Sequence, residues 1–360
     1  MKITNIYTKV LKAPLKNPFI TSLRRVDMLE DLVVFVECSD GSVGYGEGAA
    51  TPVITGETLG SMVSAIEYIK THIIGLDIED FTTILNLVHT SIVKNTTAKS
   101  ALEIALYDLK AKAEKLPLYA MLGGEKKEFR TDITISMDSV ESMVKSSLNA
   151  VALGYNSLKI KIGDNPKKDF ERIVAIHQAI DSNISLRLDA NQGWSAKQSV
   201  ELLLALEARG IVAEFIEQPV LADDIEGLLY IKQRVQTPIL ADESIFSLKD
   251  AKVLLDMQAV DYVNIKLAKT AGITQALKLA DLSASYGVKC MIGCMLEGPL
   301  SVIAGVHVAS AKADIISMID LDAVSLLASH PVETNILFDE SYIKLSDNIG
   351  LGASYTPTIN

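Results

Sequence analysis

The sequence predicts an α/β protein in which a (β/α)₈-type barrel follows a smaller α+β unit. From about residue 130, short apolar, β-branched runs alternate with stretches long enough for a helix. Charged residues end five successive runs, at intervals of about 25 residues. The residues before this alternation lack the rhythm. Eight such units match the small end of a (β/α)₈ barrel, whose catalytic residues lie at the carboxyl ends of its strands.

The first unit, residues 1–125, reads as strands followed by helices, which is typical of an α+β arrangement. Residues 2–12 alternate as a strand, and residues 32–48 predict a hairpin that turns at Asp40-Gly41. Apolar residues at helical spacing then predict three helices, over residues 57–74, 79–93 and 98–115.

The predicted barrel covers residues 126–324. Its strands are expected at residues 131–136, 157–162, 184–189, 213–217, 238–242, 261–266, 288–293 and 315–319. A last segment, residues 325–360, lacks the rhythm, and we expect it to pack back on the first unit.

Composition narrows the function. The chain of 360 residues has a formal net charge of −11, so it offers no basic surface for nucleic acid. Its three cysteines have no metal-like spacing, which favours a reducing compartment. We find no secretion signal and no apolar run of the roughly 18 residues that a membrane span needs. We therefore expect a cytoplasmic protein without nucleic-acid or membrane partners.

Lys159 and Lys161 form the first charged pair, in the run SLKIKIG. Residues i and i+2 of a strand face the same way, so both lysines are expected to point into the barrel. An edge strand with two solvated lysines is the alternative, but a closed barrel has no edge. Two ammonium groups about 5 Å apart repel by roughly 3 kcal/mol at an effective dielectric constant of about 20, which favours the neutral amine that a base requires.

Three acidic residues end the next three runs: Asp189 in LRLDANQGW, Glu217 in EFIEQPV and Asp242 in PILADES. Single acids there could simply cap helices. Three acids facing one axis repel each other unless a cation holds them. Carboxylate oxygens without histidine or thiolate favour Mg²⁺, with Mn²⁺ as an alternative. Asn191 and Glu243 are expected to orient these ligands.

Lys266, in VNIKLAK, ends the sixth run, so it should lie across the barrel from Lys161 on the second. Two bases on opposite sides of one substrate could remove a proton from either face. The five histidines do not end the second to sixth runs, and no G-x-S-x-G or phosphate-binding glycine loop occurs. Acid–base chemistry by lysine is therefore the expected mechanism.

Together, K-x-K, D-A-N-Q-G-W, E-Q-P, A-D-E-S and N-I-K-L resemble the enolase superfamily, specifically its muconate-lactonising subgroup, over essentially the whole chain. The resemblance implies that the first unit is a capping domain, completed by the carboxyl-terminal segment. It also implies that loops around residues 17–27 and 48–57 close over the barrel mouth. One departure is Ala271, where many relatives have a glycine.

Within the subgroup the chain looks most like the dipeptide epimerases. Asp320 and Asp322 correspond to the D-x-D motif that would bind the free ammonium of a dipeptide. Arg24 falls where an arginine would bind a glutamyl side chain, although Arg25 beside it leaves the register open. Substrate contacts are also implied at three further positions, Thr134, Lys159 and Cys294.

The resemblance thus implies a Mg²⁺-dependent isomerase that moves the proton at the α-carbon of a dipeptide's second residue, with alanyl-glutamate as the expected substrate. One Mg²⁺ per subunit and a homo-oligomer are implied as well. Rival activities on the same scaffold are o-succinylbenzoate synthase, muconate cycloisomerase and N-acylamino-acid racemase. A non-catalytic Mg²⁺-binding barrel is a further alternative, but it would gain nothing from two opposed bases.

Overall fold

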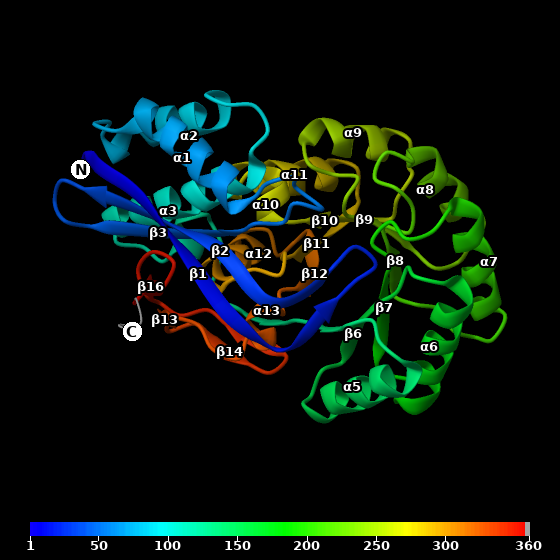
Figure 1. The fold of residues 1–360 in the computed structure, drawn as a ribbon. Coiled ribbons are helices and arrows are strands. Elements are labelled where there is room, and N and C mark those ends of the chain that lie inside the picture. The colour runs from blue at the N-terminus through cyan, green and yellow to red at the C-terminus, as the bar shows by residue number, and fades with distance from the viewer. Residues whose placement is uncertain (357–360) are drawn as a thin grey trace.

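A computed structural model describes residues 1–356, and in this range a ring of parallel strands forms the barrel (Figure 1). The strands are β5 (Ile133–Ile135), β6 (Ser157–Lys161), β7 (Ser185–Asp189), β8 (Phe215–Glu217), β9 (Ile239–Ala241), β10 (Tyr262–Ile265), β11 (Lys289–Gly293) and β12 (Ile316–Asp320). They neighbour one another in chain order, β5 to β12, and all the pairs are parallel. Each prediction is confirmed to within about two residues, the usual error of such boundaries.

Hydrogen bonds link the segments that contain the first and last strands of the ring, β5 and β12. The main-chain N–H of Asp132 donates to the Ile319 carbonyl at 3.3 Å. The N–H of Leu321 donates to the Thr131 hydroxyl at 2.9 Å. Side chains of these two strands therefore face the same interior as those of the other six.

Side chains alternate between the two faces of every barrel strand, as strand geometry requires. The outward residues of β6, such as Leu158 and Ile160, join the main hydrophobic core beneath the helices. Inward residues Phe215, Leu240 and Met318 pack together inside the barrel. Residues two positions later on these strands also point inward, one layer nearer the mouth. That periodicity places the charged residues in one layer.

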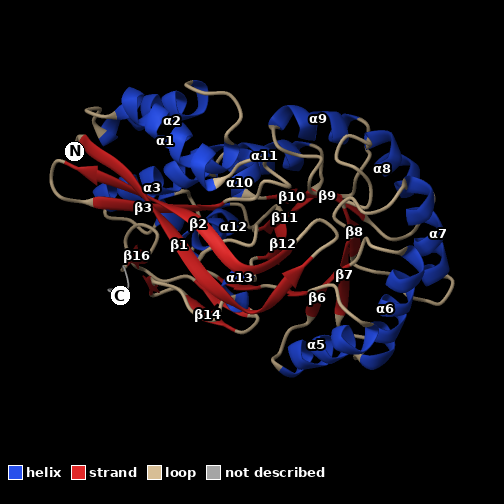
Figure 2. Ribbon diagram, in the orientation of Figure 1, coloured by secondary structure: helices blue, strands red, loops and turns tan. Residues whose placement is uncertain are grey.

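Helices surround the barrel strands on the outside (Figure 2). They are α5 (Val140–Ala152), α6 (Pro166–Ala179), α7 (Ala196–Glu207), α8 (Ile225–Lys232), α9 (Leu248–Asp256), α10 (Leu267–Thr270), α11 (Ile273–Ser285), α12 (Pro299–Ala311) and α13 (Ala323–Leu326). Several start at a polar cap: Ser139 precedes α5, Asn165 and Pro166 open α6, and Ser195 forms a capping box with Gln198. Among the helices of residues 1–356, none combines the length and the apolar content that crossing a bilayer requires.

The amino-terminal unit is an antiparallel sheet covered by helices. Its elements are β1 (Ile3–Ile20), β2 (Arg25–Cys38), β3 (Val43–Ala49), α1 (Leu59–Ile73), the 3₁₀ helix η1 (Ile78–Asp80), α2 (Phe81–Thr90), α3 (Thr96–Glu114) and α4 (Leu118–Met121). The turn at Asp40-Gly41 and the three helices are confirmed. Sheet and helices share a second core that includes Ile6, Val34 and Met62.

Strand β1 is longer than the predicted residues 2–12, because it continues to Ile20. Pro14 and Pro18 hid this continuation, since proline normally argues against a strand. The register shifts between Pro14 and Phe19, and β1 is the outer strand of its sheet, where a missing N–H costs no ladder bond. The β1–β2 hairpin consequently reaches across the barrel, as Figure 1 shows.

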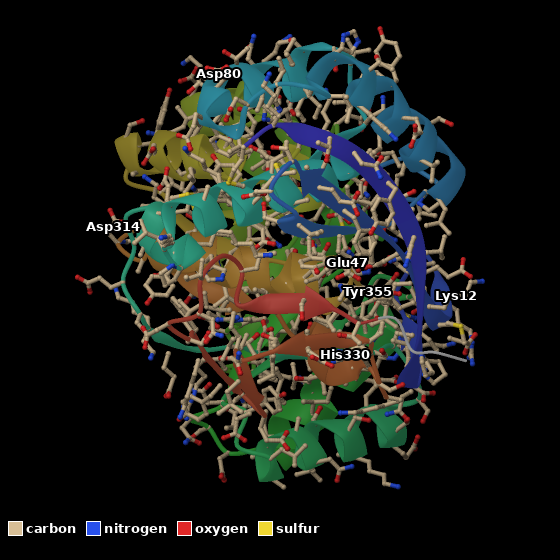
Figure 3. All side chains as sticks on the ribbon, turned by 90° about the vertical axis from the view of Figure 1, so that its left-hand side faces the viewer. Lys12, Glu47, Asp80, Asp314, His330 and Tyr355 are labelled. Atoms are coloured by element: carbon tan, nitrogen blue, oxygen red, sulfur yellow. The ribbon has the colours of Figure 1, made fainter. Side chains whose placement is uncertain are left out.

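The carboxyl-terminal segment contacts both units. It contains β13 (Val332–Thr334), β14 (Leu337–Asp339), β15 (Tyr342–Lys344) and β16 (Ala353–Tyr355); β13 pairs with β16, while β15 pairs with β4 (Glu128–Arg130). Tyr355 packs edge-on against Phe35 at 5.5 Å, and Figure 3 shows it near Glu47 of the capping sheet. The boundaries 1–125, 126–324 and 325–360 stay predictions, and residues 357–360 lie outside the described range.

Candidate active site

Lys159 and Lys161 point into the barrel mouth, where their ammonium groups share one carboxylate. The Nζ of Lys161 donates to Asp189 Oδ2 at 2.5 Å, and the Nζ of Lys159 lies 3.1 Å from the same oxygen. Both lysines are nearly inaccessible, at 2% and 5% exposure for Lys159 and Lys161. The predicted orientation of the K-x-K strand is therefore what the structure shows.

The three predicted metal ligands also converge on this mouth. Besides Asp189, Lys159 Nζ contacts Glu217 Oε2 at 2.7 Å. Asp242 Oδ2 accepts from Lys266 Nζ at 2.7 Å. All three carboxylates are buried. The structure thus brings Lys159, Lys161, Lys266 and the three acids into one cluster.

Lysine contacts decide which of these acids is ionised. Burial alone would raise the pKa of Asp189, but the ammonium groups of Lys161 and Lys159 outweigh it and lower that pKa. The same balance, with Lys266 and then Lys269 as the opposing cations, holds the pKa of Asp242 far below its usual value. Burial and repulsion from Asp189 instead raise the pKa of Glu217.

The expectation that repulsion within the K-x-K pair lowers proton affinity is wrong for Lys159, and the pKa of Lys266, across the barrel, is also raised. Burial would lower the pKa of Lys266, but the Asp242 carboxylate more than compensates and raises it. The pKa of Lys159 is likewise raised, because Asp320, Glu217 and Asp189 together outweigh its burial. The neighbouring lysines could be recognised in the sequence, but their direct contacts with carboxylates could not.

Residues in the motifs hold the acids in place. Gln218 Oε1 accepts from the main-chain N–H of Asp242 at 3.0 Å, which links E-Q-P to A-D-E-S. Asn264 Nδ2 donates to Glu217 Oε1 at 2.8 Å. These contacts explain why polar residues flank each acid, and the sequence analysis had assigned no role to Gln218 or Asn264.

Asn191 and Glu243, the predicted supporting residues, contact each other. Asn191 Oδ1 accepts from Lys161 Nζ at 3.1 Å, and its Nδ2 donates to Glu243 Oε1 at 3.2 Å. Burial, followed by repulsion from Asp242, raises the pKa of Glu243. Glu243 therefore lies behind the cluster with one carboxylate oxygen still unpartnered.

A fourth buried lysine, Lys269, was missed in the sequence. It lies in the short helix α10, and its Nζ contacts Asp242 Oδ1 and the Asp242 carbonyl. The sequence LAKT offered no strand-end position that would mark it. Only the turn of α10 directs this side chain toward the third acid.

Asp320 and Asp322 form a second acidic pair, and Asp320 shares the Lys159 ammonium group with Asp189 and Glu217. Asp320 Oδ2 accepts from Lys159 Nζ at 2.8 Å, and Asp322 Oδ2 accepts from the Thr134 N–H at 2.6 Å. Burial and repulsion from Asp320 raise the pKa of Asp322 to about 6. Asp322, unlike Asp320, has no lysine or arginine partner among the described residues, which suits an incoming ammonium group.

Asp132, which the sequence analysis did not select, joins this pair. Within the described residues, the oxygens of Asp132, Asp320 and Asp322 lie within 4.8 Å of one another, close enough for a metal ion. Asp132 already accepts from Arg187 at 2.8 Å, however. Its position two residues before Thr134 on an inward face was the signal that could have identified it.

A cavity opens over these groups and is closed by the β1–β2 hairpin. Its lining includes Lys159, Lys161, Lys266, Thr134, Cys294, Asp320 and Asp322, together with Phe19, Thr21, Leu23, Arg24, Val53 and Ile54. The hairpin is attached to the barrel by Ser22, whose hydroxyl donates to the carbonyls of Ala190 and Asn191. Both loops that were expected to cover the mouth contribute to this lining.

The structure distinguishes the two neighbouring arginines. Arg24 lines the cavity, is half-buried, and has no carboxylate within ion-pair distance among the residues described. Burial lowers the pKa of its guanidinium. Arg25 is exposed and pairs with Asp27 at 2.9 Å. Arg24 is therefore the arginine available to an anionic ligand.

Asp189, Glu217 and Asp242 have the donor chemistry of a divalent-cation site, although their oxygens are not gathered as closely as those of Asp132, Asp320 and Asp322. Among residues 1–356, Glu217 Oε2 has no hydrogen-bond partner, although the Lys159 ammonium lies 2.7 Å away. The donors are carboxylate oxygens alone, the set that Mg²⁺ prefers. A cation between Asp189 and Glu217 would relieve the repulsion that raises the pKa of Glu217.

Comparison with known families agrees with this architecture. Residues 142–359 match the family described as "Enolase C-terminal domain-like", and residues 3–123 match the "Mandelate racemase / muconate lactonizing enzyme, N-terminal domain". The chain belongs to the enolase superfamily. The predicted resemblance is thereby confirmed over both parts of the chain.

Among individual relatives, the L-Ala-D/L-Glu epimerase of Clostridium acetobutylicum is 47% identical, over 98% of each chain. The structure of a substrate-liganded complex of the L-Ala-D/L-Glu epimerase from Bacillus subtilis is similar, with a TM-score of 0.96 and 38% identity over 98% of this chain and 99% of that one. A dipeptide epimerase from Enterococcus faecalis V583, complexed with Mg and L-Leu-L-Tyr, has a TM-score of 0.94 and 38% identity over 99% and 100%. This superfamily member thus resembles dipeptide epimerases along its whole length.

Proposed function

We propose that this enzyme is a Mg²⁺-dependent dipeptide epimerase that acts at the α-carbon of the carboxyl-terminal residue. One observation supports this proposal most strongly. Lys161, at the end of β6, and Lys266, directly after β10, line one cavity from strands four positions apart in an eight-stranded ring, and the acids that they contact are buried. Lysines on opposite sides of a bound α-carbon can take the proton from one face and return it to the other.

Asp189, Glu217 and Asp242 would hold the Mg²⁺. When bound, the ion supplies a positive charge that binds the dipeptide's terminal carboxylate and stabilises the negative charge left when the α-proton departs. Lys159, between Asp189 and Asp320, is placed to neutralise the same carboxylate. Lys161 and Lys266 would then exchange the proton.

The other end of the cavity suits a free amino terminus. Asp320 and Asp322 would accept hydrogen bonds from the ammonium group, and Thr134 holds Asp322 in place through its N–H. Cys294 also lines this part, and burial raises the pKa of its thiol, so it would contact the substrate as a neutral group. N-acylated substrates, which lack the ammonium, would leave two carboxylates unpaired.

Alanyl-glutamate, in the L-Ala-D/L-Glu pair, is the proposed substrate. The half-buried guanidinium of Arg24 has no carboxylate partner among the described residues, and a bidentate glutamyl side chain would supply one. An apolar side chain would leave this cation unpaired in the bound state, which is costly. The similarity to the alanyl-glutamate epimerase of Bacillus subtilis supports this choice.

Further features belong to the same proposal. We expect one Mg²⁺ per chain, replaceable by Mn²⁺ because both ions accept carboxylate oxygens. The three cysteines are free and buried, which supports a cytoplasmic location. A homo-oligomer also remains part of the proposal.

The experiment is exchange in heavy water. L-Ala-L-Glu incubated with enzyme and Mg²⁺ should gain one deuterium at the glutamyl α-carbon and yield the L,D epimer. N-acetyl-L-Ala-L-Glu should react far more slowly, by roughly 100-fold if the two charge-assisted hydrogen bonds to its ammonium are lost. Absence of exchange would exclude epimerisation, and equal rates for both substrates would favour an N-acylamino-acid racemase.

A paired substitution separates the two acid clusters. Asp242→Asn should abolish Mg²⁺ binding. Asp322→Asn should leave the Mg²⁺ dissociation constant unchanged but raise the KM for the dipeptide. The reverse pattern would move the metal to Asp132, Asp320 and Asp322.

A further inference from the structure

Lys269 is a buried ammonium group that the proposed reaction does not use. It lies one helical turn after Lys266, and its side chain has 0% exposure. Its Nζ contacts three oxygens: Asp242 Oδ1, the Asp242 carbonyl and, at 3.2 Å, the Asn264 carbonyl. A lysine ammonium has three donors, so all are engaged.

These contacts exclude a role in proton transfer. Lys269 does not line the cavity, whereas Lys159, Lys161 and Lys266 do. Its Nζ is instead taken up by Asp242 and the Asn264 carbonyl. A buried charge needs compensating contacts, because removing a lysine ammonium group from water costs free energy.

Asp242 is held at nearly every polar atom. Its main-chain N–H donates to Gln218 Oε1 at 3.0 Å, while its carbonyl and Oδ1 accept from Lys269. Oδ2 instead accepts from Lys266, which lines the cavity, at 2.7 Å. Lys269 thus divides the carboxylate into a fixed oxygen and an available one.

We propose that Lys269 is a positioning residue for the metal site, which fixes Asp242 so that Oδ2 points at the bound Mg²⁺. The inference rests on the proposed function, in which Asp242 is a ligand. Lys269 also keeps Lys266 from bridging both oxygens of Asp242. The Lys266 ammonium then competes with the metal for a single oxygen.

A simple counter-charge role makes the opposite prediction. If Lys269 only added positive charge beside the site, its removal would strengthen Mg²⁺ binding, because two cations repel. If it positions Asp242, its removal should weaken binding by about 10- to 100-fold, the usual effect of losing a residue that orients a ligand. The sign of the change therefore separates the two roles.

The test is titration calorimetry of Mg²⁺ into protein freed of metal by a chelator. Lys269→Met should raise the dissociation constant by about 10-fold or more. Lys269→Gln, which keeps an N–H donor, covers the case in which the methionine variant does not fold, and it should give a smaller rise. An unchanged or lowered dissociation constant in the folded variant overturns the proposal.

Lys99→Met is the matched control. Lys99 is also buried, and its Nζ donates to the carbonyls of His89 and Ile92, but it lies in the capping domain. This change should reduce thermal stability without altering Mg²⁺ affinity. If Lys99→Met weakens Mg²⁺ binding as much as Lys269→Met does, the effect is general destabilisation and the inference fails.

Asp242→Asn distinguishes this inference from the function on which it depends. If Asp242→Asn leaves Mg²⁺ binding intact, the proposed metal site itself is wrong. If Asp242→Asn abolishes binding while Lys269→Met does not weaken it, only the positioning role fails.

Discussion

Two groups of buried carboxylates differ in what holds them. The mouth carboxylates, Asp189, Glu217 and Asp242, lie against lysine ammonium groups. The seam carboxylates, Asp31, Glu47 and Glu103, come from the capping domain and accept from main-chain N–H groups at the starts of barrel helices. Helix starts stabilise acids through their unpaired N–H groups, without any side-chain cation.

The partner determines the role of each group. Asp31 and Glu47 accept from Gly298 at 2.7 Å and from Leu300 at 2.9 Å, at the start of α12. Burial is the main reason that the pKa of both is raised, with repulsion from Glu47 adding to the effect at Asp31. Acids held by the backbone are fixed and dock one domain on the other. Acids held by lysine ammonium groups can exchange those contacts for a metal ion.

The largest expected effect comes from making the same change in each group. Glu217→Gln should weaken Mg²⁺ binding by more than the roughly 100-fold that loss of a supporting residue can cost, because a ligand is lost. Glu47→Gln should leave the Mg²⁺ dissociation constant within about twofold, because Glu47 accepts from the Leu300 N–H at the start of α12 and contacts no lysine of the mouth. Calorimetric titration of both variants checks the comparison, and equal losses would remove the distinction between mouth and seam.

Acid pH should destabilise the seam through His307. Burial lowers the pKa of His307 to about 4, and the ring accepts from the Tyr119 N–H and contacts the Leu351 carbonyl. Between about pH 6.5 and 4 the unfolded chain therefore binds a proton that the folded chain does not. The stability that the neutral, buried His307 ring contributes above pH 6.5 is therefore lost as the pH falls through this window, by about 3 kcal/mol in total.

Urea unfolding at pH 7.5 and pH 5 measures the part of this loss that occurs above pH 5, about 2 kcal/mol. His307→Gln keeps one acceptor and one donor, so the variant should be less stable at pH 7.5 but should lose less stability on acidification. An equal loss in the parent and the variant would assign the acid sensitivity to other groups.

Glu103→Ala should remove the contact between α3 and the start of α11. Glu103 Oε1 accepts from the Thr274 N–H at 3.1 Å and from the Thr274 hydroxyl. Leaving this partly buried N–H unsatisfied should cost about 1 kcal/mol of unfolding free energy, the lower end of the usual range. Glu114→Ala on the same helix, where the acid pairs with Lys110 in a more exposed position, should cost less than about 0.5 kcal/mol. Similar losses in both variants would contradict a special role for Glu103.

The smallest expected effect concerns Ala271. In the chain it lies between Lys269, which contacts Asp242, and Thr274, which contacts Glu103. Ala271 has a φ of +63°, a region that disfavours a side chain. Ala271→Gly should relieve that strain but give the unfolded chain more freedom, for a net gain of at most about 1 kcal/mol. Ala268→Gly, inside helix α10, is the control and should destabilise. A loss of stability in Ala271→Gly, measured by its thermal midpoint, would show that the methyl packing matters more.

The sequence predicted most of the fold because strand and helix periods are local properties. All eight barrel strands were located, since each carries an apolar outward face. The upper half of β1 was not predicted, because only an edge position makes Pro14 and Pro18 tolerable. Nor could local patterns show that part of the carboxyl-terminal segment pairs with β4.

The residues of the site also fall into those that the sequence could predict and those that it could not. Lys161, Asp189, Glu217, Asp242 and Lys266 could be selected because strand ends converge in a barrel. Lys269 and Gln218 could not, because their contacts depend on one helical turn and one loop. Asp132 was missed although its inward position, two residues before Thr134, was a signal in the sequence. Proton affinities were also beyond the sequence, since they depend on which carboxylate each ammonium group meets.

The central claim is that Lys161 and Lys266 act on opposite faces of one α-carbon. Deuterium exchange should be measured separately on L-Ala-L-Glu and L-Ala-D-Glu with Lys161→Ala and with Lys266→Ala. We expect each variant to lose net epimerisation yet to retain exchange with one epimer, and the retained epimer to differ between the two variants. Exchange of both epimers by Lys266→Ala, or retention of the same epimer by both variants, would contradict the two-base account.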